Sequence, residues 1–287
     1  QPDLNYHNEA VIEAIEEAMH FWLERGVAGF RCDVINIIYK EAIKNGKWRP
    51  ALTGSEYYLS TPGCHRVLHR LHEDVLAKYD AFTVGETVFV TPKMADDLVN
   101  PAREELSTVF AFEHMETDCY KIKWFLRRFN PDRFFACLTK WQKALPWNTV
   151  YLENHDQPRI CHYVKNRSDL ENYTAFLYFL KGSTLIYAGQ EFGCDETPSL
   201  FDKDVFPRNT GIDLSNLFAK LDTIKKTVLD DDDYFKADAD DENDIAILER
   251  DNNKSKKVGI FSLKSKLADR KSTRLNSSHH SISYAVF

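Results

Sequence analysis

The sequence predicts an α/β fold in which parallel strands alternate with helices and form part of a barrel. Five short apolar runs of strand length recur between residues 27 and 188, and stretches with helical periodicity separate them. This alternation is typical of parallel β/α units with right-handed crossovers. No glycine-rich phosphate loop follows any of the runs, so the usual reason for a doubly wound nucleotide-binding sheet is absent and a barrel is favoured.

A helix is expected first, because Asn8 can cap it, Gly26 can end it, and apolar residues recur between them at helical spacing. The first strand is expected at residues 27–33. The four later strands are expected at residues 82–86, 108–112, 149–153 and 183–188.

The character of the chain changes after residue 229. An acidic run is followed by two apolar segments, residues 244–249 and 257–263, which a polar turn at residues 251–254 joins. We therefore expect a partial catalytic barrel over residues 1–229 and the start of a small antiparallel β domain over residues 230–269. Residues 270–287 are serine-rich, lack periodicity and resemble read-through of a sequencing or cloning adapter, so we expect a non-native tail there.

Composition narrows the classes of function. The formal net charge of −7 and pI near 5.8 give no general attraction for nucleic acid or anionic membranes, so a neutral small molecule is the better substrate. No apolar run is long enough to span a membrane as a helix. Six scattered cysteines without a C-x-x-C pair are expected to be reduced thiols, which favours a cytoplasmic protein. Gln1 stands where a start methionine would, so a targeting segment could precede it.

Charged residues cluster at the predicted strand ends. Arg31 and Asp33 are two positions apart, so pleating turns both side chains to one face of the first strand. Alone, this pair could be a buried salt bridge, and Glu86 could be a helix cap or a protonated acid. Together with His155 and Asp156 these residues place three carboxyl groups and an imidazole at the carboxyl ends of successive strands, where a barrel builds its active site. Such crowding keeps one carboxylic acid protonated beside an ionised partner, the division of labour that glycoside hydrolysis needs.

Four segments carry a more specific signal. Residues 1–5 (QPDLN), 29–36 (GFRCDVIN), 84–87 (VGET) and 153–159 (ENHDQPR) resemble the conserved blocks of glycoside hydrolase family 13, the α-amylase family. The resemblance extends over about residues 1–265 and is greatest to the oligo-1,6-glucosidase group, whose relatives include dextran glucosidase and trehalose-6-phosphate hydrolase.

The resemblance implies a fold and a reaction. The five strands would be strands 4 to 8 of a (β/α)8 TIM barrel, with the first three strands and their sugar-binding histidine absent. The reaction would be that of a retaining, exo-acting α-glucosidase that hydrolyses α-1,6-linked gluco-oligosaccharides such as isomaltose through a covalent glucosyl-enzyme intermediate. Hydrolysis of α-1,4-linked gluco-oligosaccharides stays open. We also expect no cofactor and no metal site, and the charge argument above leads us to expect no nucleic-acid or membrane partner. The isolated chain is expected to be inactive.

The resemblance also implies roles for single residues. Asp33 would be the nucleophile, Glu86 the acid/base, and Asp156 the residue that holds the glucose hydroxyls. Arg31 would orient Asp33, and His155 would hydrogen-bond the sugar. Arg159 would contribute either to a neighbouring sugar subsite or to the structure. Val34 would line the substrate site, because a valine at this position accompanies a preference for α-1,6 bonds in the group.

Two alternatives remain open. Trehalose-6-phosphate hydrolase shares these blocks, and its substrate would need a cation near the second sugar. A non-catalytic glucosidase-like scaffold keeps the barrel but loses the acidic residues, which the presence of Asp33, Glu86 and Asp156 argues against.

Overall fold

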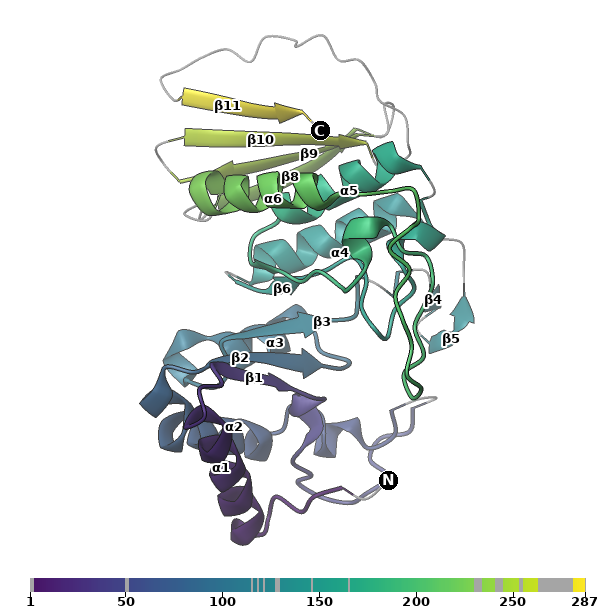
Figure 1. Ribbon diagram of the computed structural model, residues 1–287. Helices are drawn as coiled ribbons and strands as arrows, with labels where there is room; N and C mark the ends of the chain where they lie inside the picture. Colours follow the sequence, from purple (N-terminus) through teal and green to yellow (C-terminus); the bar gives the residue numbers. More distant parts are fainter. Residues whose placement is uncertain are drawn as a thin grey trace. The chain divides into compact units, whose positions relative to one another are not determined.

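The computed structural model divides the chain into two compact units, residues 1–113 and residues 114–287, which are described separately (Figure 1). The structure describes residues 3–49, 52–114, 116–117, 119–120, 122–126, 130–145, 147–164, 166–229, 234–240, 245–252, 255–262 and 281–286.

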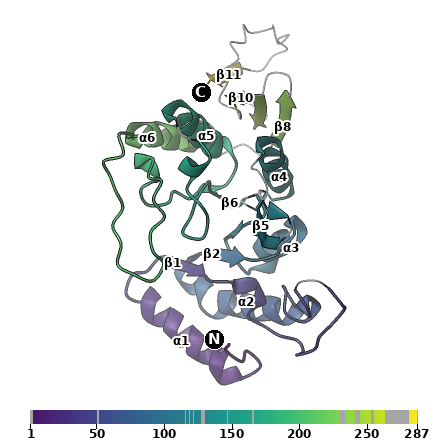
Figure 2. The ribbon, with the colours of Figure 1, turned by 90° about the vertical axis from the view of Figure 1, so that its right-hand side faces the viewer.

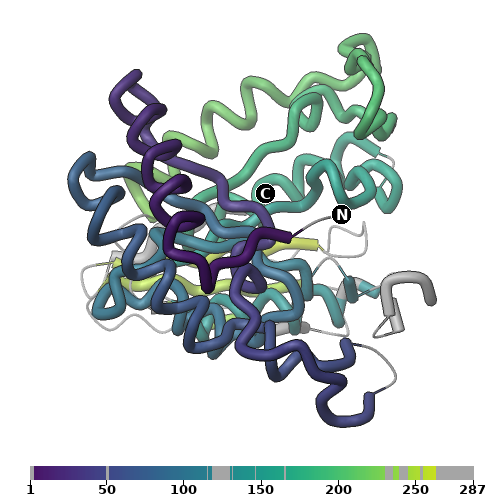
Figure 3. Tube along the Cα trace, turned by 90° about the horizontal axis from the view of Figure 1, so that it is seen from below, coloured from purple at the N-terminus to yellow at the C-terminus, as the bar shows by residue number. Residues whose placement is uncertain are grey.

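The first unit is built on a three-stranded parallel sheet in the order β1-β2-β3. Its strands are β1 (Gly29–Cys32), β2 (Phe82–Thr87) and β3 (Thr108–Ala111), and its α-helices are α1 (Glu9–Leu23), α2 (Pro62–Asp74) and α3 (Pro92–Val99). Asn8 caps α1 as expected, since its side chain accepts the Ala10 N–H. Helices α1 and α2 lie side by side (Figures 2 and 3) and pack through Ile12, Val67 and Leu71.

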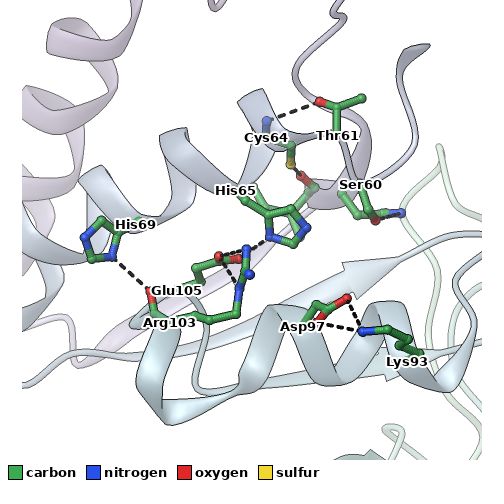
Figure 4. A network of polar contacts seen from close by, with 11 residues as sticks. Ser60, Thr61, Cys64, His65, His69, Lys93, Asp97, Arg103 and Glu105 are labelled. Atoms are coloured by element: carbon green, nitrogen blue, oxygen red, sulfur yellow. Dashed lines mark hydrogen bonds and ion pairs between the residues drawn. The ribbon is translucent and has the colours of Figure 1, made fainter. Parts of the chain in front are cut away.

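Helix α2 is fixed by buried polar contacts (Figure 4). His65 Nδ1 lies 2.6 Å from Oε2 of the buried Glu105, whose other oxygen accepts from Arg103 Nε at 2.9 Å. At the start of the helix, Cys64 Sγ donates to the carbonyl of Ile35 at 3.3 Å. These contacts tie α2 both to the segment before β3 and to the turn after β1.

The second unit contains a parallel strand pair and a larger sheet. The pair is β6 (Thr149–Val150) and β7 (Ser183–Thr184), and the α-helices are α4 (Pro131–Ala144), α5 (Arg167–Phe179) and α6 (Ser215–Ile224). A π-helical turn over Lys225–Leu229 follows α6 directly. A separate two-stranded sheet is formed by β4 (Cys119–Tyr120) and β5 (Ile122–Leu126).

All five strands expected from the apolar runs are present, and each pairs in parallel. In the part of the chain that the structure describes, they fall into two sheets rather than one. The last two are shorter than expected, with two residues each, although Leu185 continues the pairing by donating to the Val150 carbonyl at 2.9 Å.

The C-terminal sheet has the order β11-β10-β9-β8. Strands β8 (Tyr234–Asp240), β9 (Ile245–Asp251) and β10 (Ser255–Ser262) form an antiparallel meander that contains the expected hairpin. Of the tail at residues 270–287, the structure describes only β11 (Ser281–Val286), which pairs in parallel with β10. The non-native origin of the tail therefore stays a prediction.

This sheet shares one core with the helices before it, and the expected boundary at residues 229/230 stays a prediction. Phe235, Leu248 and Phe261 of the sheet are buried in the same cluster as Phe176 of α5. Asn172 of α5 exchanges two hydrogen bonds with the backbone of Ser262. The two compact units divide at residues 113/114, so the meander and these helices belong to the same unit.

Within the described residues, no helix combines the length and apolarity needed to cross a membrane. No cluster of three or more potential metal-ligating His, Cys, Asp or Glu side chains occurs in the same part of the chain. The described free cysteines are Cys32, Cys64, Cys137, Cys161 and Cys194.

Candidate active site

Two carboxyl groups meet one guanidinium at the carboxyl end of the first unit's sheet. Arg31 Nη1 forms an ion pair with Asp33 Oδ1, and Arg31 Nη2 lies 2.6 Å from Glu86 Oε2. The β1–β2 register pairs Cys32 with Gly85, so Asp33 and Glu86 each stand one residue beyond the last paired position. Because side chains alternate along β1, Arg31 and Asp33 lie on the same face and can contact each other. The register between β1 and β2 then brings Glu86 next to this pair.

The environments of the two carboxyl groups differ. The Asp33 side chain is 74% exposed, whereas that of Glu86 is 8% exposed. Burial raises the pKa of Glu86 above its ordinary value, and the hydrogen bond with the Asp33 side chain raises it further. The Arg31 guanidinium and the Val34 N–H oppose this rise in pKa. The arrangement favours a protonated Glu86 beside a solvent-accessible Asp33.

Val34 adopts a left-handed backbone conformation, with φ 43° and ψ 38°. A β-branched residue is a rare occupant of this region, because its side chain crowds the backbone. Strand β1 thus ends before Val34 and does not continue its pleat. The turn aims the Val34 N–H at Glu86 Oε2, 3.2 Å away. The residue predicted to influence linkage therefore also holds the candidate acid/base through its backbone.

His155 and Asp156 lie in the segment after β6 of the second unit. Their side chains are partly exposed, with 3.2 Å between His155 Nε2 and Asp156 Oδ2. The Asp156 N–H donates to Asn154 Oδ1 at 2.9 Å, which shapes the turn that carries the carboxylate. This pair and the Arg31–Asp33–Glu86 group are each defined within their own unit.

Arg159 is buried in the second unit, with 1% of its side chain exposed. Its Nη1 lies 2.6 Å from Oε1 of Glu153, whose other oxygen accepts the Ile160 N–H at 2.7 Å. The guanidinium also stacks on Tyr187, 4.2 Å from the ring centroid. These contacts hold Arg159 in the buried part of its unit, and which of the two expected roles it has stays a prediction.

Sequence reasoning singled out Glu153 only as the first residue of a conserved block. Its role as a buried partner of Arg159 becomes visible only in the fold, where burial raises the pKa of its carboxyl against the opposing Arg159. The sequence signal that could have found the pair is a Glu and an Arg at the two ends of one polar segment after an apolar strand.

These features define a class: α/β proteins built from parallel β/α units, with a carboxyl pair at the carboxyl ends of neighbouring strands. The chain belongs to the alpha-amylase family, since the family profile described as "Alpha amylase, catalytic domain" matches residues 1–258.

The similar curated proteins include several oligo-1,6-glucosidases. That of Parageobacillus thermoglucosidasius is 41% identical over 220 residues, which is 70% of this chain and 39% of the relative. That of Bacillus cereus is 39% identical over 205 residues, 67% of this chain and 37% of the relative. Trehalose-6-phosphate hydrolase of Bacillus subtilis is 34% identical over 207 residues, 67% and 36% of the two chains. The chain thus spans less than half the length of these relatives.

Solved structures share the fold. Trehalose-6-phosphate hydrolase of Bacillus licheniformis superposes with a TM-score of 0.75 at 24% identity, over 87% of this chain and 59% of that one. Trehalulose synthase of Pseudomonas mesoacidophila gives a TM-score of 0.74 at 20% identity, over 88% and 60%. At these identities the likeness establishes the fold of the alpha-amylase catalytic domain and nothing finer.

Proposed function

We propose that this chain carries the nucleophile, Asp33, and the acid/base, Glu86, of a retaining α-glucosidase. The observation that supports it is the bridge by Arg31, which holds both carboxyl groups on one guanidinium. Retaining enzymes keep their two carboxyl groups about 5 to 5.5 Å apart, whereas inverting enzymes leave about 6.5 to 9.5 Å for a water molecule. Two carboxyl groups that share a guanidinium fit the closer arrangement.

The geometry fits a two-step reaction. In the first step the Asp33 carboxylate attacks the anomeric carbon, and the bond to the leaving oxygen breaks as Glu86 protonates that oxygen. In the second step the Glu86 carboxylate takes a proton from water, whose oxygen displaces Asp33 from the sugar. The raised pKa of Glu86 suits the first step, since it keeps the acid protonated beside an exposed nucleophile.

We further propose that the five parallel strands are strands 4 to 8 of a (β/α)8 barrel. Family membership supports this assignment, as does the parallel pairing of all five strands. By the same resemblance, Asp156 holds the sugar hydroxyls and His155 hydrogen-bonds the sugar. The partial exposure of both side chains is consistent with these roles.

For the substrate we propose α-1,6-linked gluco-oligosaccharides such as isomaltose, because the relatives at 39 and 41% identity are named oligo-1,6-glucosidases. Trehalose-6-phosphate hydrolase is the alternative, supported by a relative at 34% identity. The carboxyl pair on Arg31 argues against a non-catalytic scaffold, which has no need of a buried acid beside an exposed carboxylate.

The test compares kcat/KM of the full-length protein on isomaltose, maltose and trehalose 6-phosphate, and adds covalent labelling by a mechanism-based glucosyl inactivator. We expect isomaltose to be the best substrate. Asp33→Ala should lower kcat by orders of magnitude and abolish labelling. The control is Asp97→Ala, which removes an exposed carboxylate paired with Lys93 and should change neither. Labelling that survives in Asp33→Ala would overturn the assignment of Asp33 as the nucleophile. A preference for trehalose 6-phosphate would favour trehalose-6-phosphate hydrolase over the proposed oligo-1,6-glucosidase.

A further inference from the structure

Asn36 is a fully buried amide in an otherwise apolar stretch, three residues after Asp33. Its side chain makes two hydrogen bonds with the backbone of one residue. Asn36 Nδ2 donates to the Val88 carbonyl at 2.9 Å, and Asn36 Oδ1 accepts the Val88 N–H at 3.0 Å. Val88 follows Glu86 by two residues. The side chain of Asn36 therefore joins the loop that carries Asp33 to the loop that follows Glu86.

The position of this clamp matters because the strand pairing has already ended. The β1–β2 ladder stops at Cys32 and Gly85, while the β2–β3 ladder continues to Thr87 and Ala111. Beyond Gly85, the side of β2 that faces β1 is held by the Arg31 and Val34 contacts to Glu86 and by the Asn36 clamp. A side-chain amide can present an N–H donor and a carbonyl acceptor side by side, as a strand backbone does, so Asn36 replaces the missing rung of the ladder.

The clamp is itself anchored. The Asn36 carbonyl accepts the Ser60 N–H at 2.7 Å, and Asn36 Nδ2 lies 3.5 Å from Ser60 Oγ. Ser60 directly precedes Thr61, the N-cap of α2. Asn36 thus connects the two catalytic loops to helix α2, which the His65–Glu105 contact fixes.

We propose that Asn36 is a positioning residue that sets the spacing of the Asp33 and Glu86 carboxyl groups by clamping the loop after β1 to the loop after β2. Its catalytic consequence rests on the proposed function, whereas its structural consequence does not. Loss of the clamp leaves the Val88 N–H and carbonyl without these partners and lets the end of β2 move away from β1. A displacement of about 1 Å at a catalytic group can lower turnover about 100-fold.

The clamp also keeps water away from the carboxyl group of Glu86. Arg31 and Asp33 face Glu86 from the β1 side, and the β3 position opposite Glu86 is the non-titratable Phe110. If the loops separate, water reaches Glu86 and weakens the contribution of burial to its pKa. The alkaline limb of the pH profile of kcat/KM, which reports the pKa of Glu86, should then move toward lower pH. A residue that only adds stability would not move this limb.

The test uses Asn36→Leu, which keeps the side-chain size and removes both hydrogen bonds. Asn172→Leu is a matched control, because Asn172 is also buried and makes the same two-bond clamp on Ser262 within the second unit. In the full-length protein we expect both variants to unfold at lower temperature. Asn36→Leu alone should lower kcat about 10- to 100-fold, with a smaller change in KM. It should also move the alkaline limb of the pH profile of kcat/KM toward lower pH.

Equal kcat values and equal pH limbs in the two variants would overturn the inference. Amide exchange of the wild type gives a second test that needs no variant. The Val88 N–H should exchange as slowly as the N–H groups of the β1–β2 ladder, and rapid exchange would contradict the clamp. If the wild type hydrolyses no α-glucoside, the proposed function fails by itself. Carbon NMR titration of the Glu86 carboxyl then decides the inference, since only Asn36→Leu should lower its pKa.

Discussion

Arg31 Nη2 lies 2.6 Å from Glu86 Oε2, although the two residues are 55 positions apart in the chain. Their strands are neighbours whose register pairs Arg31 with Val84, two residues before Glu86. Because side chains alternate along a strand, Val84 and Glu86 share a face, and the guanidinium can reach diagonally to the carboxyl group. This contact connects the candidate acid to the candidate nucleophile through one guanidinium.

The first prediction concerns pH. The proposed reaction requires protonated Glu86, whose pKa is raised by burial. We therefore expect kcat/KM to persist above the pH at which an ordinary glutamate ionises and to fall as pH rises through the Glu86 pKa. In Glu86→Gln this alkaline limb should disappear. The measurement is the pH profile of kcat/KM on isomaltose, whose leaving sugar needs the proton, for the wild type and for the residual activity of Glu86→Gln. A limb that remains unchanged in Glu86→Gln would assign it to another group.

The second prediction concerns linkage and Val34. Val34→Thr should change the isomaltose-to-maltose ratio of kcat/KM by about 10- to 200-fold, since one side chain in a subsite discriminates by about 1 to 3 kcal/mol. Val34→Gly should also change the ratio and should stabilise the fold, because glycine tolerates the φ of 43°. The measurements are kinetics on both disaccharides and thermal unfolding. If neither variant changes the isomaltose-to-maltose ratio of kcat/KM, Val34 does not determine the linkage preference. The proposed retaining mechanism would not be affected by that result.

The third prediction concerns Arg159. Arg159→Met should cost about 3 to 5 kcal/mol of unfolding free energy, because it leaves the Glu153 carboxylate buried without its cation. The double variant Glu153→Gln with Arg159→Met should recover part of this loss. Lys226→Met is the control, an exposed partner of Asp222 whose removal should change stability by about 0.5 kcal/mol at most. Unchanged stability of Arg159→Met together with a raised KM would favour a role of Arg159 in a sugar subsite over a structural role.

The fourth prediction concerns Gly29 at the start of β1. A Cβ at this position would lie 1.8 Å from the Phe82 carbonyl oxygen on the paired strand. Gly29→Ala should therefore force the two strands apart and cost about 1 to 3 kcal/mol or more. Denaturant unfolding measures the loss. Gly26→Ala is the comparison, since a Cβ there meets open space and only its φ of 89° opposes the change. Equal losses would show that the close approach of β1 and β2 is not the cause.

The sequence by itself determined the local features of this protein. Five apolar runs located five parallel strands, Asn8 located the start of a helix, and two-residue spacing placed Arg31 and Asp33 together. These features depend on periodicity and capping within a few residues of chain, which a single sequence displays directly. Conserved blocks also identified the family, and the family profile confirmed it.

The tertiary structure decided what depends on contacts between distant segments. Register brought Glu86 to Arg31, and the end of the β1–β2 ladder gave Val34 its left-handed turn and Asn36 its partner. Packing placed Arg159 on Glu153 and merged the C-terminal meander with the helices before it. No local pattern encodes these outcomes, because the same strands and polar residues fit several registers and cores, and only the assembled fold selects among them.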